Sequence, residues 1–185
     1  LEALLARAKA EPGTLTYSSS GNAVSNHIAT VVLLRRAGAD MTHVPYRGGG
    51  PALQAVLAGD VDCGFATVAS AAALVQDGRL RALAASSAAR IPSLPAVPTV
   101  AEQGFAGYDQ VEWNGLYGPA GLPGPAVTRL FECCRAALAD AAVQGRLAGL
   151  GAIGLGTAPA EFDAWLKRER AAMAVVAREA NITAD

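Results

Sequence analysis

The sequence lacks an excess of charge of either sign, a long apolar run and a recognisable set of paired cysteines. Its formal net charge is −1, so composition gives no reason to expect nucleic acid or an anionic membrane surface as a partner. No run of about 18 residues is both apolar and uncharged, which excludes a predicted membrane span. With 52% hydrophobic residues, the chain is instead expected to fold around a substantial core.

The three cysteines form neither a disulfide pattern nor a metal pattern. Cys133 and Cys134 are adjacent and Cys63 is remote from both. Adjacent cysteines rarely bond to each other, because a disulfide needs two Cα atoms about 4.4–6.8 Å apart in a compatible direction. No CxxC motif or suitably spaced histidine completes a zinc site. We interpret all three as buried small hydrophobic residues and expect no metal and no cofactor.

The amino end has no basic segment followed by an apolar stretch, so no secretory signal is predicted within the sequence. The chain opens at Leu1, just before a helical pattern over residues 2–10. We interpret it as a processed product or an excised fragment, for which the missing signal is no argument for the cytoplasm.

Short apolar runs alternate with helical patterns in the first half of the chain. Strands are predicted at 15–18, 41–44, 61–66 and 80–85, and helices at 22–37, after the glycine-rich loop at 46–50 as far as Gly59, and at 68–76. This alternation indicates βαβ units and a mostly parallel sheet. The loops at 18–22, 45–50 and 66–68 leave the carboxyl ends of strands, where α/β proteins bind ligands.

The pattern changes after residue 90. Residues 91–99 contain three prolines and are predicted to be extended. A strand is predicted at 111–117, and helices at about 125–139 and about 159–180. Residues 14–100 therefore form a predicted α/β lobe, whereas 110–185 contain too little sheet for a second one. The apolar faces of these last helices need a surface to cover, so the segment is interpreted as half of a second lobe.

The stretch LTYSSSGNAVSNHI, residues 15–28, joins a strand to a helix through small residues. The first amides of a helix lack internal partners and attract anions, which suits a carboxylate or a phosphate. An ordinary serine-rich turn with a helix cap is the plainer alternative. A serine nucleophile is not supported, because no GxSxG elbow is present and neither His27 nor His43 has a defined geometry to the serines. Both histidines are interpreted as surface or structural residues.

Four stretches together resemble the extracytoplasmic solute receptors of tripartite tricarboxylate transporters, the Bug or TctC-like family. They are LTYSSSGNAVSNH, HVPYRGGGPALQAVLAGDVDCGF, GRLRALAASSAARIPSLPAVPTVAEQG and WNGLYGPAGLPGPAV. The resemblance implies an α/β fold like that of type II periplasmic binding proteins, with a carboxylate ligand between two lobes. Residues 1–13 would be a linking helix, 14–100 most of lobe two, and 101–185 a crossover strand and helices of an incomplete lobe one.

The resemblance also implies the residues of a ligand site, and no catalytic residue. The predicted site consists of Ser18, Ser19, Ser20, Gly21, Asn22, Ser25, Tyr46, Arg47, Gly48, Ala66 and Thr67. The serine loop would hold the ligand carboxylate, and Ala66 and Thr67 would face its distal end. Relatives often have Gly in place of Ser18 and Ala23, a hydroxyl residue in place of Val24, and Asp-Asn in place of Ala66-Thr67. We therefore expect a less polar distal group, such as a monocarboxylate or an aromatic acid. Arg47 is interpreted as a solvated loop charge rather than a ligand salt bridge.

The function implied by the resemblance is capture of a small organic acid in the periplasm of a Gram-negative bacterium and its delivery to membrane permease subunits. A signal peptide is then expected upstream of this sequence. Alternatives are the effector-binding domain of a transcriptional regulator, for which the chain shows no DNA-binding module, an enzyme, and a truncated receptor without a transport role. The unpaired helix faces of the half lobe predict self-association.

Overall fold

The structure, a computed structural model, describes residues 1–180 and residue 182. It divides into two units, of which unit 1 is Leu1–Glu112 with Val176–Asp185 and unit 2 is Trp113–Val175. The boundaries predicted for the two lobes remain predictions, since they concern a larger assembly than these units.

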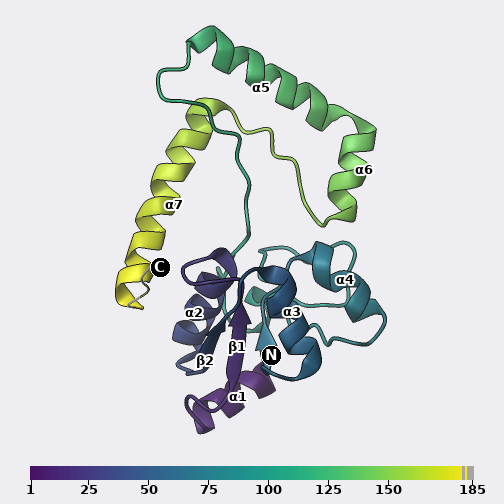
Figure 1. The fold of residues 1–185 in the computed structure, drawn as a ribbon, viewed down its shortest axis with the longest axis vertical. Helices are drawn as coiled ribbons and strands as arrows, with labels where there is room; N and C mark the ends of the chain where they lie inside the picture. The colour runs from purple at the N-terminus through teal and green to yellow at the C-terminus, as the bar shows by residue number, and fades with distance from the viewer. Residues whose placement is uncertain (181, 183–185) are drawn as a thin grey trace. The chain divides into compact units, whose positions relative to one another are not determined.

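Unit 1 contains a three-stranded parallel sheet. Its strands are β1 (Thr16–Ser19), β2 (Thr42–Pro45) and β3 (Cys63–Gly64), in the order β2-β1-β3. Tyr17 is opposite His43 on one side and Cys63 on the other. The helices that follow the strands are α2 (Ser25–Ala37), α3 (Gly49–Ala58) and α4 (Val68–Gln76), and Figure 1 shows α2 and α3 to either side of β1. The predicted α/β class with a parallel sheet is confirmed.

The hydrophobic core of unit 1 lies between the sheet and the surrounding helices. Its buried members come from α1 (Glu2–Ala10), β1, α2, the residues just before β1 and β2, and the segment after residue 99; they are Leu5, Ala8, Leu15, Tyr17, Leu33, Leu34, Ala37, Met41, Val100 and Tyr108. Tyr108 is 1% exposed and its hydroxyl donates to the Ala29 carbonyl at 2.8 Å. This bond fixes the chain that leaves the sheet against α2.

Several predicted elements of unit 1 are wrong in extent. α2 begins at Ser25 rather than at about residue 22, and β3 has two residues instead of six. No strand forms at 80–85, because only Ala85 finds a partner, in a single parallel bridge to Thr99. Residues 91–99 are not extended, since the Leu94 and Val97 amides close two successive turns. The proline spacing excluded a helix there but not turns.

The turn segment leads into a short capped helix, η1 (Ala101–Gln103). The Thr99 hydroxyl accepts from the Glu102 amide at 3.0 Å, and the Glu102 carboxylate accepts from the Thr99 amide at 2.6 Å. This reciprocal pair is a capping box. Arg90 Nε lies 3.0 Å from both Glu102 carboxylate oxygens, so the PTVAE sequence has a structural role here.

Unit 2 consists of helices and extended segments. Its helices are α5 (Gly124–Ala139), α6 (Ala141–Gly149) and most of α7 (Pro159–Glu179), of which α5 and α7 were predicted and α6 was not. The predicted strand at 111–117 is wrong, because no backbone partner for it exists among the described residues. Figure 1 shows this segment as a long connection without strand.

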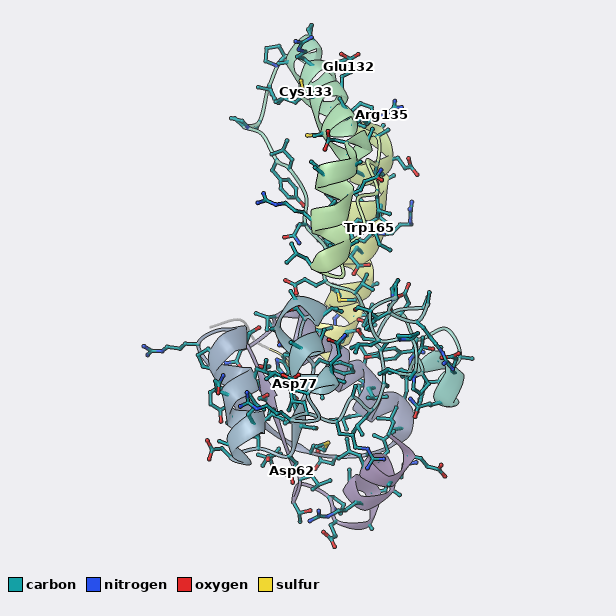
Figure 2. All side chains as sticks on the ribbon, turned by 90° about the vertical axis from the view of Figure 1, so that its right-hand side faces the viewer. Asp62, Asp77, Glu132, Cys133, Arg135 and Trp165 are labelled. Atoms are coloured by element: carbon teal, nitrogen blue, oxygen red, sulfur yellow. The ribbon has the colours of Figure 1, made fainter. Side chains whose placement is uncertain are left out.

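No described residue of unit 2 is fully buried. A ring cluster is its main side-chain contact: Trp113 stands edge-on to Trp165 at 5.0 Å between centroids, and Phe162 stacks on Trp165 at 6.0 Å. Figure 2 labels Trp165 in this helical unit and shows Glu132 and Arg135 on the surface of α5. Cys133 is exposed, so its interpretation as a buried residue was wrong.

Candidate functional site

The loops that follow the three strands meet at the carboxyl edge of the sheet. The Tyr46 amide donates to the Ser19 carbonyl at 2.9 Å, and the Gly48 amide donates to the Ser20 carbonyl at 3.2 Å. On the other side, the Asn26 side-chain amide donates to the Phe65 carbonyl at 3.2 Å. The loop after β1 and the first turn of α2 are therefore bonded to both neighbouring strand ends, which confirms that the three loops share one edge.

The serine loop keeps its shape through its own side chains. The Ser19 hydroxyl donates to the Gly21 carbonyl at 2.7 Å, and Asn26 Oδ1 accepts from the Ser20 amide and hydroxyl at 3.2 and 3.1 Å. The Ala23 amide donates to His27 Nδ1 at 3.1 Å. We define residues 18–25 as the serine loop. The end of this loop occupies residues 22–24, which were predicted as helix, so α2 begins at Ser25.

Three helices begin at this edge, and none of their N-termini is capped by a side chain or neutralised by an acidic residue. α2, α3 and α4 have no side-chain cap and no acidic residue in the first turn. Among the described residues, no acceptor bonds to the first-turn amides of Ser25, Asn26, Gly49, Gly50, Val68 and Ala69. Free amides at the positive end of a helix dipole attract anions, so this edge offers donors for a carboxylate.

The strand order adds a topological argument for the same place. The chain passes from β1 to β2 on one side and then crosses to β3 on the other, so the order reverses at β1. In open α/β sheets, ligands occupy the crevice beyond the strand ends at such a switch point. The Asn26–Phe65 bond lies at this crevice between β1 and β3.

The predicted site residues fall into two groups. Ser18 and Ser19 are 2% and 0% exposed, so their side chains lie beneath the loop rather than on it. The others are partly or fully exposed at the edge: Ser20, Gly21, Asn22, Ser25, Tyr46, Arg47, Gly48, Ala66 and Thr67. Arg47 is exposed, as expected of a solvated charge. Direct ligand contact by any of these residues remains a prediction.

Three side chains beneath the edge were not predicted as part of the site, namely Asn26, His27 and His43. His43 Nε2 lies 2.6 Å from the Ser19 hydroxyl oxygen, and the two imidazole rings stack at 3.8 Å between centroids. Burial lowers the pKa of His27 from its usual 6.5. Burial and the neighbouring His27 lower the pKa of His43 to about 4. The contact between Ser19 and His43 could have been predicted, because alternate residues of neighbouring parallel strands lie on the same face of the sheet.

The Ser19–His43 contact does not make a nucleophile. Ser19 is fully buried, and its proton goes to the Gly21 carbonyl at 2.7 Å. In the described part of the chain no carboxylate bonds to His43, so no third group orients the imidazole as a base. The described residues also include no cluster of three or more His, Cys, Asp or Glu suited to a metal ion.

Comparison with known proteins gives the class to which this fold and site belong. A family described as "Tripartite tricarboxylate transporter family receptor" matches residues 1–155. A UPF0065 protein in the tcbD-tcbE intergenic region of Pseudomonas sp. strain P51 is 39% identical over 157 residues, which are 84% of this chain and 47% of that protein. BugT of Bordetella pertussis is 31% identical over 179 residues, or 97% of this chain and 55% of BugT.

Solved structures agree with the sequence relatives. R. palustris Rpa4515, solved with adipate, has a TM-score of 0.89 and 30% identity, and the match covers 99% of this chain and 61% of that one. MatC of Rhodopseudomonas palustris, with bound malate, has a TM-score of 0.82 and 28% identity over 95% of this chain and 61% of MatC. A periplasmic binding protein, BugD, has a TM-score of 0.85 at 27% identity, covering 98% of this chain and 62% of BugD.

The chain therefore belongs to the tripartite tricarboxylate transporter receptor family, the Bug or TctC family. The predicted resemblance is confirmed, and so is the prediction of a binding protein rather than an enzyme. The chain spans about half the length of the two curated relatives named above, 47% and 55%. Within the described residues, no helix is both long and apolar enough to cross a bilayer.

Proposed function

We propose that this chain is part of a periplasmic receptor that holds one carboxylate of a small organic acid at the carboxyl edge of the β2-β1-β3 sheet. The main observation is that three helices open at one edge with neither caps nor acidic residues in their first turns. The structures of two relatives with adipate and with malate support a carboxylate ligand. Family membership supports delivery of this acid to the membrane permease subunits of a tripartite tricarboxylate transporter.

The strength of binding follows from the number of donors. A hydrogen bond to a charged group contributes about 1.5–3 kcal/mol, so two or three amides contribute roughly 4–8 kcal/mol before the cost of immobilising the ligand. Micromolar affinity needs about 8 kcal/mol net. We therefore expect the 185-residue chain to bind a carboxylate with a Kd well above the micromolar range. A low-micromolar Kd in calorimetry would contradict this expectation.

The far end of the ligand is proposed to be weakly polar. Ala66 offers no polar side-chain group, and the Thr67 hydroxyl is already within 3.0 Å of the Ser70 hydroxyl. A second carboxylate would gain little at this position, so a monocarboxylate or aromatic acid fits better than a dicarboxylate. Comparison of benzoate with adipate at equal concentration tests this point, and tighter binding of adipate would overturn it.

The experiment that tests the proposed function is a residue-resolved NMR titration of the chain with adipate and benzoate. Because weak binding is expected, ligand concentrations up to about 50 mM are needed. Amide shifts should concentrate on Ser25, Gly49, Gly50 and Val68. Neutral adipamide, which lacks the charge, should leave these amides unshifted. Shifts confined to other parts of the chain, or none at all, would rule the site out.

A matched pair of variants separates the site from a general effect of charge. Gly50→Asp places a carboxylate among the open amides, and Gly145→Asp places the same charge in α6. At both glycines an added Cβ meets nothing within 4 Å, so neither change creates a clash. We expect Gly50→Asp to weaken adipate binding at least about tenfold, or 1.4 kcal/mol, through like-charge repulsion. Gly145→Asp should bind like the unchanged chain.

A further inference from the structure

Both histidines of the chain lie together beneath the serine loop. The sequence contains two histidines, His27 on α2 and His43 on β2, and their rings stack at 3.8 Å with an interplanar angle of 17°. Tyr17 of β1 packs against His43 at 4.9 Å between centroids and lies 6.2 Å from His27, so the three rings form a triangle. Residues remote in sequence thus form one cluster of rings, and each imidazole also bonds to the loop above.

The hydrogen bonds determine where the protons are. His27 Nδ1 accepts from the Ala23 amide, so His27 is neutral with its proton on Nε2. The Ser19 hydroxyl donates to Gly21 and therefore accepts from His43 Nε2–H. A neutral His43 then has a bare Nδ1. Protonation of His27 would replace the acceptor with a second donor facing the Ala23 amide, and protonation of His43 would place a charge against the His27 ring.

The residue held by His27 has an unusual backbone. Ala23 has φ 56°, the one positive φ of a non-glycine residue in the described chain. This left-handed conformation costs an alanine energy that a glycine avoids. The Ala23 amide bond to His27 is the contact that offsets this cost. Since Ala23 lies between Gly21 and the first open amides of α2, its conformation sets the direction of those amides.

The surroundings of the pair contain few charges that could stabilise a proton. The titratable groups facing it are Tyr17 on β1, Arg35 on α2, Asp40 before β2 and Cys63 on β3, which lies against Tyr17. No described carboxylate bonds to either imidazole. A cavity of about 460 Å³ lined by Tyr17, His27, Arg35 and Asp40 gives water access to His27, which is 7% exposed.

From this geometry we infer that His27 and His43 are positioning residues, which keep the serine loop in its anion-binding conformation only while both imidazoles are neutral. His27 acts through the Ala23 amide. The His43 Nε2–H bond to Ser19 is present in both protonation states, so protonation of His43 acts through the charge that it places against the His27 ring. The consequence for ligand binding rests on the proposed function. The effect on the loop itself does not, because it concerns contacts within the free protein.

The direction of the pH dependence follows from the pKa shifts. Both folded-state pKa values lie below the usual 6.5, and that of His43 is about 4. The contribution of the neutral pair to stability is therefore complete above pH 6.5 and is lost as the pH falls from 6.5 toward 4. Anion affinity should fall over the same interval, although a cationic imidazole would by simple attraction raise it.

The first test needs no ligand. In a ¹⁵N-labelled chain titrated from about pH 7.5 to about 4.5, His27 should show a bare Nδ1 at the upper end. The Ala23 and Gly21 amide signals should shift with the same midpoint as the His27 ring nitrogens. Three results would each overturn the inference. The first is a protonated His27 Nδ1 at the upper pH, and the second is an Ala23 amide signal that does not shift during the titration. The third is unfolding, detected by far-UV circular dichroism, with the same midpoint.

Two substitutions at His27 separate positioning from packing. His27→Asn keeps an acceptor near the Nδ1 position without titrating, so the Ala23 amide should remain protected from solvent exchange at all pH values tested. His27→Leu fills the space without an acceptor, and exchange of the Ala23 amide should be at least about tenfold faster. Equal exchange in the two variants would show that the ring acts only by packing.

The binding measurement uses trifluoroacetate as the anion, because it stays ionised throughout the titration. Its affinity should fall about tenfold for each pH unit below the His27 midpoint and should be independent of pH in His27→Asn. A constant or rising affinity in the unchanged chain would overturn the inference. If trifluoroacetate and adipate both fail to bind at pH 7.5, the proposed function fails, and the ligand-free titration still decides whether the histidines position the loop.

Discussion

Gly64 lies so close to β1 that a side chain has no room there. A Cβ at this position would overlap the Ser18 hydroxyl oxygen and would lie 3.2 Å from the Ser18 carbonyl oxygen. Ser18 is 2% exposed and pairs with Gly64 in the sheet, so its backbone cannot move aside. The short β3 can therefore pack this closely against β1 only because residue 64 has no side chain.

The predicted consequence is that Gly64→Ala destabilises the sheet by about 1–3 kcal/mol, as overpacking of a close contact does. Hydrogen exchange of the Tyr17 and Ser18 amides measures this change, since both tryptophans lie in unit 2 and report on that unit. Gly145→Ala is the control, because a Cβ there meets nothing within 4 Å and alanine favours a helix. Unchanged exchange in Gly64→Ala would show that β3 moves freely.

At the scale of single residues, the contacts beneath the loop are partly predictable. Tyr17 and Ser19 share a face of β1, and His43 lies beside Tyr17 in the parallel register. Alternation along two predicted strands is enough to suggest that Ser19 and His43 meet. The φ of 56° at Ala23 does not follow from the preference of alanine, and the glycine that relatives often have at this position was the signal for it.

At the scale of elements, η1 is held by a charged capping box. The Arg90 guanidinium, with the Thr99 amide, holds the pKa of the Glu102 carboxyl below its usual 4.5. A depressed pKa means that the charged form contributes to stability above pH 4.5 and that this contribution is lost as the pH falls through the lower folded value. The capping box of Thr99 and Glu102 thus holds the turns at 91–99 next to Val100 of the core.

We predict that Thr99→Val destabilises this segment by about 1 kcal/mol. Valine keeps the shape of the side chain, which is 1% exposed, but removes the acceptor for the Glu102 amide. Faster exchange of that amide is the measured quantity. Thr128→Val, on the exposed surface of α5, should change stability by less than about 0.5 kcal/mol. An equal effect of both substitutions would argue against the box.

The bounds of a helix or strand were predicted correctly where the local sequence pattern alone determines them. α4 begins and ends as predicted, at Val68 and Gln76. Strands at 80–85 and 111–117 were wrong, because apolar alternation supplies only the tendency and a strand also needs a partner. Residues before Ala85 find none in the described chain, and the same holds for the segment ending at Tyr117.

At the scale of the whole molecule, unit 2 differs from unit 1 because many of its large apolar side chains are exposed to solvent. Eight large apolar side chains of unit 2 are at least 40% exposed: Trp113, Leu116, Tyr117, Leu130, Leu150, Ile153, Leu155 and Val175. Ile153 and Leu155 are 83% and 82% exposed. Exposed apolar surface of this kind favours association.

We therefore predict that the chain self-associates in solution. Sedimentation velocity should show the average mass rising with concentration above the 18.7 kDa of one chain. Ile153→Lys with Leu155→Lys should shift the equilibrium toward the monomer. Ala10→Lys with Ala73→Lys adds the same charges at exposed sites of unit 1 and should leave it unchanged. A monomer at every concentration would contradict the prediction.

The strand order has a consequence for the timing of synthesis. Of the three described strands, β1 is made first and is the central one, so it leaves the ribosome before either of its neighbours does. Its first partner, β2, starts at residue 42, and its second, β3, ends at residue 64. At about 5–20 residues per second, β1 has no neighbouring strand for one to several seconds, and its apolar side chains are then available to any chaperone at the tunnel exit.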